Sequence, residues 1–340
     1  MRVLVAMSGG VDSSVAAAML AEQGHEVTGV TLKLWGGASD SGCCSVSDVE
    51  DARRVAAQLG IPHYVFNFSD DFGAAVVDPY VDAHRRGETP NPCVECNRTI
   101  KFGRLLARAN ALGFDALATG HHARVRRARS GTYSLARGVD RAKDQSYVLY
   151  MLGQRELERT LLPVGEHTKA DVRDMATRLG LRTADKPDSM DVCFIARGER
   201  ERFLGERVAL HPGPIVSTDG VVIGAHGGME KFTVGQRRGL GVAAGARRYV
   251  VGVDAVTARV TVGTRDELLR DSVALRDLVF AGGHPGDGPL VAQPRAHGEA
   301  VDALLDGECV RFVSPQPRVA PGQIVALYRG DVVLGGGIAA

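Results

Sequence analysis

The stretch RVLVAMSGGVDSSVAAAMLAEQG (residues 2–24) predicts a buried β-strand, a tight glycine loop and a helix in immediate succession. The strand is indicated by the apolar run at 2–7, and the helix by the Ala-rich segment 11–24, which ends at a glycine as helices commonly do. Gly9 and Gly10 permit a backbone path with no side chain in the way. Backbone N–H groups and the helix dipole then favour an anion at this loop.

The alternation of strand and helix continues to about residue 122. A capping box from Ser47 to Glu50 is expected to open the second helix. Strands that alternate with helices form a parallel sheet with right-handed crossovers, and ligands bind at the carboxyl ends of its strands. We therefore predict an α/β fold, with a doubly wound, Rossmann-like parallel sheet. Its further strands are expected at 26–35, 62–68 and 115–122, and its further helices at 47–60, 70–86 and 98–113.

The sequence changes character after about residue 205. Alternating apolar segments separated by Asp-Gly, Pro-Gly and Gly-rich turns predict antiparallel β-structure, in two groups. We predict an α/β domain at 1–205 that carries a helical extension with an amphipathic helix at 168–180. A small central β domain at 206–266 and a C-terminal β-barrel domain at 267–340 are expected to follow.

Composition excludes several classes of protein. The net charge is +1, so a nucleic-acid partner must be held by local patches such as HHARVRRARS (121–130), continued by Arg137, Arg141 and Lys143. That run is also compatible with an ordinary solvated surface. No apolar run reaches membrane-spanning length and the N-terminus does not resemble a signal peptide, so a cytoplasmic protein is expected. Six cysteines in 340 residues do not make a disulfide scaffold.

One acidic residue stands out in the glycine loop. Asp12 would repel a phosphate unless a divalent cation lay between them, so it points to Mg²⁺. Ser8, Ser13 and Ser14 add hydroxyl donors to the loop. The Walker motif G-x-x-x-x-G-K-[ST] does not occur.

The segment PNPCVECNR (90–98) places two cysteines between prolines and a predicted helix. Cys96 directly precedes the helix expected near Arg98, a position that lowers the pKa of a thiol. Half a zinc site, a redox pair and a labile iron–sulfur cluster held by Cys93, Cys96 and Cys193 are the alternatives. The three other cysteines are expected to be buried or incidental: Cys43, Cys44 and Cys309.

The loop SGGVDSS resembles the pyrophosphate loop of the ATP pyrophosphatases, which cleave ATP between its α and β phosphates and adenylate a carbonyl oxygen. A longer ordered set of segments resembles the tRNA-specific 2-thiouridylases over essentially the whole chain. That set comprises SGGVDSSVAA, TPNPCVECNRTIKF (89–102), LATGHHA (117–123), KDQSYVLYML (143–152), PVGEHTKADVR (163–173), DSMDVCFI, GQRRGLGV (235–242), YVVGVD (249–254) and LGGGIA (334–339).

This resemblance implies a role for each matching residue. Cys96 would be the nucleophile and Cys193 the carrier of a persulfide, with a transient disulfide between them. Some family members carry Asp where this chain has Cys93. ATP would be bound by Ala6, Met7, Ser8, Gly9, Gly10, Val11, Asp12, Ser13, Leu32 and Gly120. The target uridine would contact Asn91, Pro92 and Cys93, and the tRNA would contact His121, Lys143, Asp144, Gln145 and Gln323.

The implied reaction is ATP-dependent sulfur transfer to carbon two of the wobble uridine. The implied partners are Mg²⁺ with ATP, tRNA through its anticodon stem-loop, and a cysteine desulfurase or a sulfur-relay protein. The residues alone leave two other classes open. One is a pyrophosphate-loop ligase that acts on a small metabolite, and the other is a non-catalytic RNA-binding module.

Overall fold

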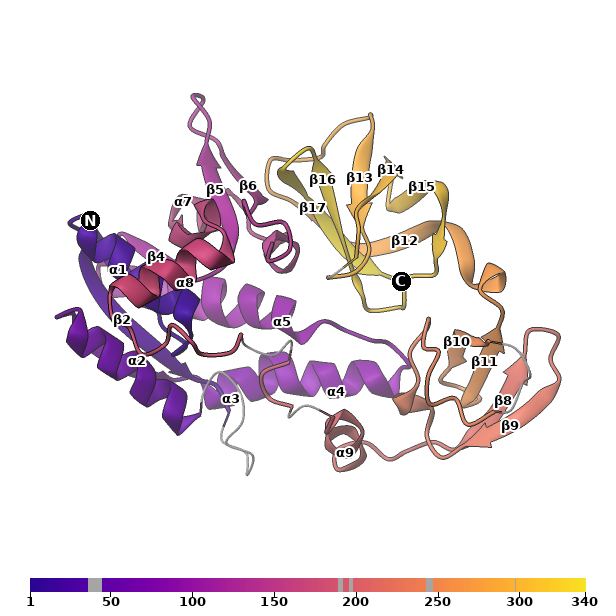
Figure 1. Ribbon diagram of the computed structural model, residues 1–340. Coiled ribbons are helices and arrows are strands. Elements are labelled where there is room, and N and C mark those ends of the chain that lie inside the picture. The colour runs from indigo at the N-terminus through magenta and orange to yellow at the C-terminus, as the bar shows by residue number, and fades with distance from the viewer. Residues whose placement is uncertain (36–44, 189–191, 196–197, 243–246, 297) are drawn as a thin grey trace.

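The structure is a computed structural model that describes residues 1–35, 45–188, 192–195, 198–242, 247–296 and 298–340. The N-terminal half forms the α/β part, and two β-structures lie beside it, one in the middle and one at the C-terminus of the chain (Figure 1). Within the described residues, no helix is both long and apolar enough to cross a membrane. Cys43 and Cys44 lie outside the described residues.

A five-stranded parallel sheet in the order β3–β2–β1–β4–β7 forms the centre of the N-terminal half. The side chains of the central strand β1 show that the sheet is buried on both faces. Val3 and Val5 point into one apolar cluster and Leu4 into another, because successive side chains of a strand alternate in direction. The strands are β1 (Arg2–Ala6), β2 (Glu26–Lys33), β3 (His63–Asn67), β4 (Ala116–Thr119) and β7 (Thr160–Leu161).

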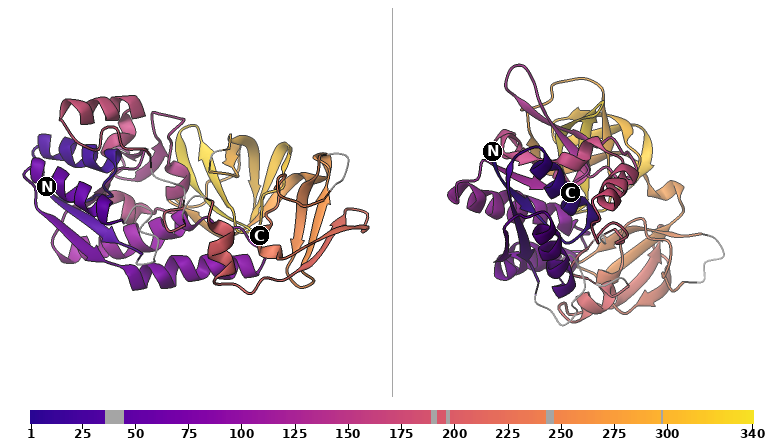
Figure 2. Two further views of the ribbon diagram at one scale, coloured as in Figure 1. Left: turned by 60° about the horizontal axis from the view of Figure 1, so that its bottom comes forward. Right: turned by 60° about the vertical axis from the view of Figure 1, so that its left-hand side comes forward.

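Helices cover both faces of this sheet, as the alternation of elements predicts (Figures 1 and 2). On the side of Val3 and Val5 pack α1 (Val11–Glu22), α2 (Val46–Gln58) and α8 (Lys169–Arg178). On the side of Leu4 packs a rod made of α3 (Ser69–Phe72), the π-helical η1 (Gly73–Val77) and α4 (Asp78–Arg85). A second rod on that side joins α5 (Pro92–Glu95), the π-helical η2 (Cys96–Leu105) and α6 (Leu106–Ala111).

Two predictions of helix starts are wrong. The side chain of Ser45, not Ser47, caps α2 by accepting a hydrogen bond from the Asp48 N–H, 3.1 Å away. The second rod begins at Pro92 rather than near Arg98, with Asn91 as its N-cap. A proline at the first helical position is favourable, because its missing N–H would have no partner there.

Shorter elements follow the fourth strand. The β5–β6 hairpin (Ala123–Arg127 and Tyr133–Arg137) comes first, and Lys169 later opens α8. The remaining short helices are η3 (Ser146–Leu149), α7 (Gln154–Glu158), η4 (Pro163–Glu166), α9 (Arg200–Gly205), η5 (Met229–Lys231) and η6 (Asp266–Leu268).

The middle of the chain forms a four-stranded sheet in the order β10–β11–β8–β9. Its strands are β8 (Gly213–Ser217), β9 (Val222–His226), β10 (Tyr249–Asp254) and β11 (Arg259–Gly263). Two of its pairings are antiparallel, as expected, but β8 and β11 run parallel. Parallel pairing is possible here because a long connection separates these strands.

The C-terminal part closes into a six-stranded antiparallel barrel, because β12 pairs with both β15 and β17. Its strands are β12 (Leu269–Phe280), β13 (Leu290–Gln293), β14 (Val301–Asp306), β15 (Cys309–Pro317), β16 (Ile324–Arg329) and β17 (Val332–Ala339). The predicted fold class, a parallel α/β domain followed by β-rich parts that include a barrel, is confirmed.

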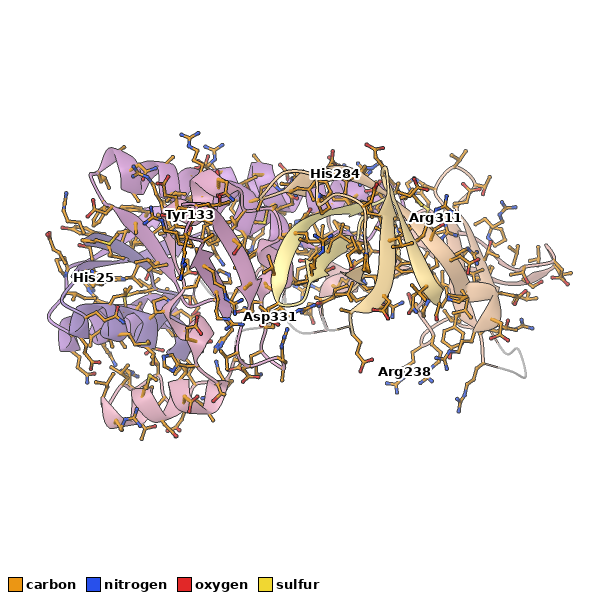
Figure 3. All side chains as sticks on the ribbon, turned by 90° about the horizontal axis from the view of Figure 1, so that it is seen from above. His25, Tyr133, Arg238, His284, Arg311 and Asp331 are labelled. Carbon is orange, nitrogen blue, oxygen red and sulfur yellow. The ribbon has the colours of Figure 1, made fainter. Side chains whose placement is uncertain are left out.

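The barrel is joined to the α/β part by backbone pairing and by a shared core. Strand β6 of the hairpin pairs with β17, with Leu135 opposite Val333. Tyr328 of the barrel is fully buried in the same apolar cluster as Tyr147, and the Arg137 guanidinium lies 3.6 Å from the centre of the Tyr328 ring. Asp331 lies at this junction (Figure 3). The barrel therefore packs against the α/β part and shares part of its hydrophobic core.

Candidate functional site

A cleft of about 880 Å³ opens at the carboxyl ends of β1, β2 and β4, where a parallel sheet is expected to bind its ligand. It collects residues from the glycine loop, the PNPC segment, the segment that follows α8, and the barrel. Every site residue predicted from the sequence lines it except Gly9. Those residues are Ala6, Met7, Ser8, Gly10, Val11, Asp12, Ser13, Leu32, Asn91, Pro92, Cys93, Cys96, Gly120, His121, Lys143, Asp144, Gln145, Cys193 and Gln323.

The glycine loop is held tightly from both sides. Gly9 has φ +74°, and a Cβ there would lie 2.2 Å from the Asp48 carbonyl oxygen at the start of α2. A Cβ on Gly120, at the end of β4, would lie 2.6 Å from the Ser13 nitrogen. The Ser14 hydroxyl donates to the Gly10 carbonyl and is fully buried, so it does not serve as a ligand donor as its sequence position suggested.

The Asp12 carboxylate has two side-chain partners, Lys169 and His122. Lys169 Nζ lies 2.8 Å from Oδ1 and 2.7 Å from Oδ2 of Asp12, and His122 Nε2 donates to Oδ1 over 3.0 Å. Burial raises the pKa of Asp12, but the hydrogen bonds from His122 and Lys169 lower it by more, so the pKa lies below its ordinary value. Asp12 is therefore a carboxylate at neutral pH.

Lys186 links the glycine loop to two carboxylates. Its Nζ donates to the Gly9 carbonyl at 3.0 Å and lies 2.6 Å from Asp48 Oδ1 and 2.7 Å from Asp51 Oδ2. Burial lowers the pKa of Lys186, but the hydrogen bonds to the two carboxylates outweigh it and the pKa is raised. The ammonium group therefore stays charged beside the loop that is predicted to bind an anion.

Asp188 gathers three cations at the other wall. Its carboxylate lies 2.9 Å from the Nζ of Lys143, 2.9 Å from the Nζ of Lys169 and 3.0 Å from Nη2 of Arg173. Burial raises the pKa of Asp188, but hydrogen bonds from Lys143 and Lys169 dominate and hold it well below its ordinary range. Lys169 thus bridges the carboxylates of Asp12 and Asp188.

Cys93 and Cys96 both border the cleft, but their positions relative to the start of the helix differ from the prediction. Asn91 Oδ1 accepts from the Cys93 N–H at 3.0 Å, so Cys93 lies in the first turn of the helix and Cys96 one turn further in. The helix-dipole argument therefore fits Cys93 better than Cys96, because the dipole's effect fades beyond the first turn. Arg98, two residues beyond Cys96, donates to the Tyr150 hydroxyl at 3.0 Å.

Cys96 is buried and Cys193 is half-buried. Cys96 is the first residue of the π-helical segment, a geometry that recurs at functional sites. The structure thus brings to one cleft two cysteines that are 97 positions apart in the chain (193 − 96).

Five residues were predicted to contact tRNA, and most have partners inside the protein. Asp144 accepts from the Gly138 N–H at 2.9 Å and from Arg137 Nη1 at 2.9 Å. Gln145 Oε1 accepts from the His122 N–H at 2.9 Å, and Gln323 donates to the Thr89 carbonyl just before the PNPC segment.

His121 and the basic run have their own environments. His121 Nδ1 lies 2.7 Å from the Thr119 hydroxyl, and burial, followed by the charges of Lys101 and His122, keeps its pKa well below the ordinary value. In the basic run, Arg124, Arg126 and Arg141 all pair with Asp331. Part of that positive charge is therefore neutralised at the junction with the barrel.

The sequence did not single out Lys169, Lys186, Asp188 or His122. One signal was available, because Lys169 is the first residue of α8. A cation at a helix N-terminus is unfavourable, so it indicates an anionic partner. Lys186 and Asp188 carry no such signal, because their partners lie far away in the sequence.

The residues present fit one of the predicted metals and not the other. Nucleotide-bound Mg²⁺ needs only one or two carboxylates beside the phosphates, and Asp12 and Asp48 line the cleft. An iron–sulfur cluster or a zinc ion needs a closed set of ligands. Among the residues that the structure describes, no three His, Cys, Asp or Glu side chains form such a set. Cys93, Cys96 and Cys193 therefore do not fit a cluster.

Three family models match the chain in order. The model of the tRNA methyl transferase HUP domain matches residues 1–197, and that of the tRNA methyl transferase PRC-barrel domain matches residues 201–264. The model of the aminomethyltransferase beta-barrel domain matches residues 270–339.

Full-length relatives share one name, tRNA-specific 2-thiouridylase MnmA. The protein from Roseiflexus sp. is 49% identical over 366 residues, which cover 99% of this chain and 98% of its own. The protein from Herpetosiphon aurantiacus is 50% identical over 347 residues, covering 99% and 97% respectively. The protein from Mycobacterium avium is 49% identical over 354 residues, covering 98% of both chains.

Proposed function

The chain belongs to the tRNA-specific 2-thiouridylase family, and from this premise we propose which residues carry out the reaction. The protein is an ATP-dependent sulfurtransferase that thiolates uridine in tRNA. The descriptions of the family models mention methyl transfer, but the full-length relatives, at about half identity, indicate the reaction more directly.

One observation supports the assignment of roles: the anion-binding loop, Cys96 and Cys193 border the same cleft. ATP bound at the loop would present its α-phosphate to a uridine whose base enters beside Asn91, Pro92 and Cys93. The uridine is accessible because a base in an anticodon loop is already unpaired, which lowers the cost of turning it into the cleft.

In the first step, the O2 oxygen of the uridine attacks the α-phosphorus of ATP. A bond forms between O2 and phosphorus, the bond to the bridging oxygen breaks, and pyrophosphate leaves. The negative charge on the departing pyrophosphate would be met by the loop N–H groups, Lys169 and Lys186. The rest of the ATP site would be lined by Ala6, Met7, Ser8, Gly10, Val11, Asp12, Ser13, Leu32 and Gly120, and Gly9 would fix the shape of the loop.

In the second step, the terminal sulfur of a Cys193 persulfide attacks carbon two, and AMP leaves with O2. Cys96, as a thiolate, then attacks the Cys193 sulfur. The bond between the Cys193 sulfur and the sulfur attached to carbon two breaks, 2-thiouridine is released, and a Cys96–Cys193 disulfide forms. The transferred sulfur gains the two electrons that the cysteines lose, so an external dithiol must reduce the disulfide before the next cycle.

The remaining partners follow from this scheme. Mg²⁺ would be held by Asp12 and Asp48 and would supply charge neutralisation on the phosphates. The residues proposed to contact the tRNA all line the cleft: His121, Lys143, Asp144, Gln145 and Gln323. A cysteine desulfurase or a sulfur-relay protein would load Cys193. The domain boundaries at 205/206 and 266/267 remain a prediction.

The experiment is to measure pyrophosphate release with and without tRNA. Release should be stimulated by tRNA that has a wobble uridine and not by the same tRNA with a wobble cytidine. Cys96→Ser and Cys193→Ser should each stop thiolation. Release that is independent of tRNA would favour the small-metabolite ligase, and thiolation at the normal rate by either variant would contradict the assigned roles.

A further inference from the structure

Cys193 lies in a stretch that regular secondary structure does not hold. Residues 192–195 form a turn, closed by a hydrogen bond of 3.4 Å from the Ile195 N–H to the Val192 carbonyl. Neither a helix nor a strand includes these four described residues. The packing of the neighbouring side chains therefore contributes to where the Cys193 sulfur lies.

The neighbouring residue, Phe194, is firmly packed. Its side chain is only 3% exposed and lies in a cluster of aromatic rings, which we call the aromatic cluster. The ring centres of Phe194 and the other members are 5.4–6.2 Å apart, and two of the pairs meet edge to face. The other members are Trp35 at 6.2 Å, Phe72 at 5.6 Å, Tyr80 at 5.6 Å and Phe203 at 5.4 Å.

The aromatic cluster is tied to the element that carries the other cysteine. Phe72 and Tyr80 belong to the rod of α3, η1 and α4, and this rod packs against η2, which begins at Cys96. Phe72 also borders the cleft. The Phe194 ring therefore fixes the turn relative to the helix of Cys96, while the adjacent residue Cys193 lines the cleft.

We propose that Phe194 is a positioning residue for sulfur transfer, which sets where the Cys193 sulfur lies relative to Cys96 and the activated base. This inference rests on the proposed function, in which Cys193 carries the sulfur. It assigns to Phe194 no part in ATP binding or adenylation. Edge-to-face packing restricts the orientation of the ring as well as its depth, so a smaller apolar residue would keep the turn buried without fixing its orientation.

The structure offers a matched control in Phe203, which belongs to the aromatic cluster but is ten positions away from Cys193 (203 − 193). The variants are Phe194→Ala, Phe194→Leu, Phe203→Ala and Cys193→Ser. Each full-length protein is loaded with inorganic polysulfide, and the fraction of persulfide on Cys193 is determined by mass spectrometry. Two rates are then measured in a single turnover with MgATP and tRNA: release of pyrophosphate and formation of 2-thiouridine.

For Phe194→Ala, we expect the rate of pyrophosphate release to be unchanged and 2-thiouridine formation per persulfide to fall by about 100-fold, the usual effect of misplacing a reacting atom by an ångström. Phe194→Leu should show a smaller loss. For Phe203→Ala, thiolation should slow by no more than about threefold, because the Phe194 ring keeps its contacts with Trp35, Phe72 and Tyr80.

The other outcomes separate two failures. If Cys193→Ser forms 2-thiouridine at the normal rate, the proposed function is wrong. If Cys193→Ser is inactive but Phe194→Ala transfers sulfur as fast as wild type, or no more slowly than Phe203→Ala, the positioning role is wrong. Should Phe194→Ala also lose pyrophosphate release, its fold is damaged and Phe194→Leu decides: a loss confined to sulfur transfer supports the role, and equal loss of both rates overturns it.

Discussion

Lys169 Nζ lies 2.7 Å from Asp12 Oδ2 and 2.9 Å from Asp188 Oδ1, so one ammonium group joins the glycine loop to the segment that leads towards Cys193. Its side chain is only 11% exposed. If a cation replaces Lys169 at these two carboxylates, the Lys169 ammonium group becomes available to bind a phosphate. This arrangement supports the proposal that Mg²⁺ and ATP bind in the cleft together.

Replacing Lys169 with Met should weaken the use of ATP. The KM for ATP is expected to rise by about 10- to 100-fold, because a hydrogen bond to a charged group contributes roughly 1.5–3 kcal/mol. Pyrophosphate release at varied ATP concentration measures it. Lys231→Met is the control, since Lys231 pairs at 3.8 Å with Glu201, outside the cleft. An unchanged KM in Lys169→Met would remove this lysine from the ATP site.

Gly120→Ala should damage the nucleotide site by steric overlap. A Cβ there would lie 2.6 Å from the Ser13 nitrogen and 2.7 Å from the Asp12 carbonyl carbon, which are backbone atoms that cannot turn away. Overpacking of this kind costs about 1–3 kcal/mol, and ATP binding measured by calorimetry should fall with it. Gly73→Ala should leave ATP binding intact, because among the described residues no atom beyond its chain neighbours and its own helix backbone lies within 4 Å of the added Cβ.

Stability should decline as the pH falls below about 6.5, the ordinary pKa of histidine. Burial, followed by the Arg200 charge, lowers the pKa of His84 to about 3, and burial lowers that of His121 as well. At a pH between the ordinary pKa of histidine and the lowered pKa in the folded protein, each of these histidines is protonated in the unfolded chain but not in the folded chain. Each of these two histidines therefore makes folding less favourable by up to about 1.4 kcal/mol per pH unit on acidification.

Urea unfolding at several pH values between about 5.0 and 7.5 tests this. The buried Nε2 of His84 has no hydrogen-bond partner among the residues that the structure describes, so His84→Phe can be accommodated without stranding a polar group. This variant should lose less stability on acidification than wild type does. An identical dependence of the unfolding free energy on pH in the two proteins would show that His84 is not the source.

The tip of the β5–β6 hairpin should contribute to tRNA binding by charge alone. Arg127 and Arg129 are exposed, in contrast to Arg124, which is bound to Asp331. Replacing both exposed arginines with Gln should reduce the slope of log Kd against log salt by about 0.7–0.9 for each tRNA phosphate that the tip no longer neutralises. Replacing Arg53 and Arg54 of α2 with Gln changes the net charge equally and should leave the slope unchanged. Equal effects of the two double variants would argue against binding of tRNA by the hairpin.

The parallel sheet could be predicted from the sequence because its signals are local. Apolar strands, glycine stops and amphipathic helices each occupy a short window, and β1, α1 and β2 lie within two residues of the predicted ranges. The start of the second rod differs from the prediction because Pro92 lies inside the helix rather than ahead of it. Asn91 followed by Pro92 is in fact a helix start signal.

The cleft could be predicted only in part. The glycine loop and the cysteines have recognisable spacing, whereas the ion pairs of Lys186 join residues more than 130 positions apart. The pairing of β6 with β17 likewise joins Leu135 to Val333, and no local pattern indicates it. Such long-range contacts depend on how the domains pack, and hydrophobic periodicity carries no information about that.

The most direct test of the central claim follows the sulfur on both cysteines in one turnover. Enzyme carrying a Cys193 persulfide is mixed with MgATP and tRNA without reductant, quenched, and analysed by peptide mass spectrometry together with the nucleosides. We predict that each 2-thiouridine formed is accompanied by one Cys96–Cys193 disulfide. Appearance of 2-thiouridine while both cysteines remain thiols, or with the transferred sulfur traced to another cysteine, would contradict the account.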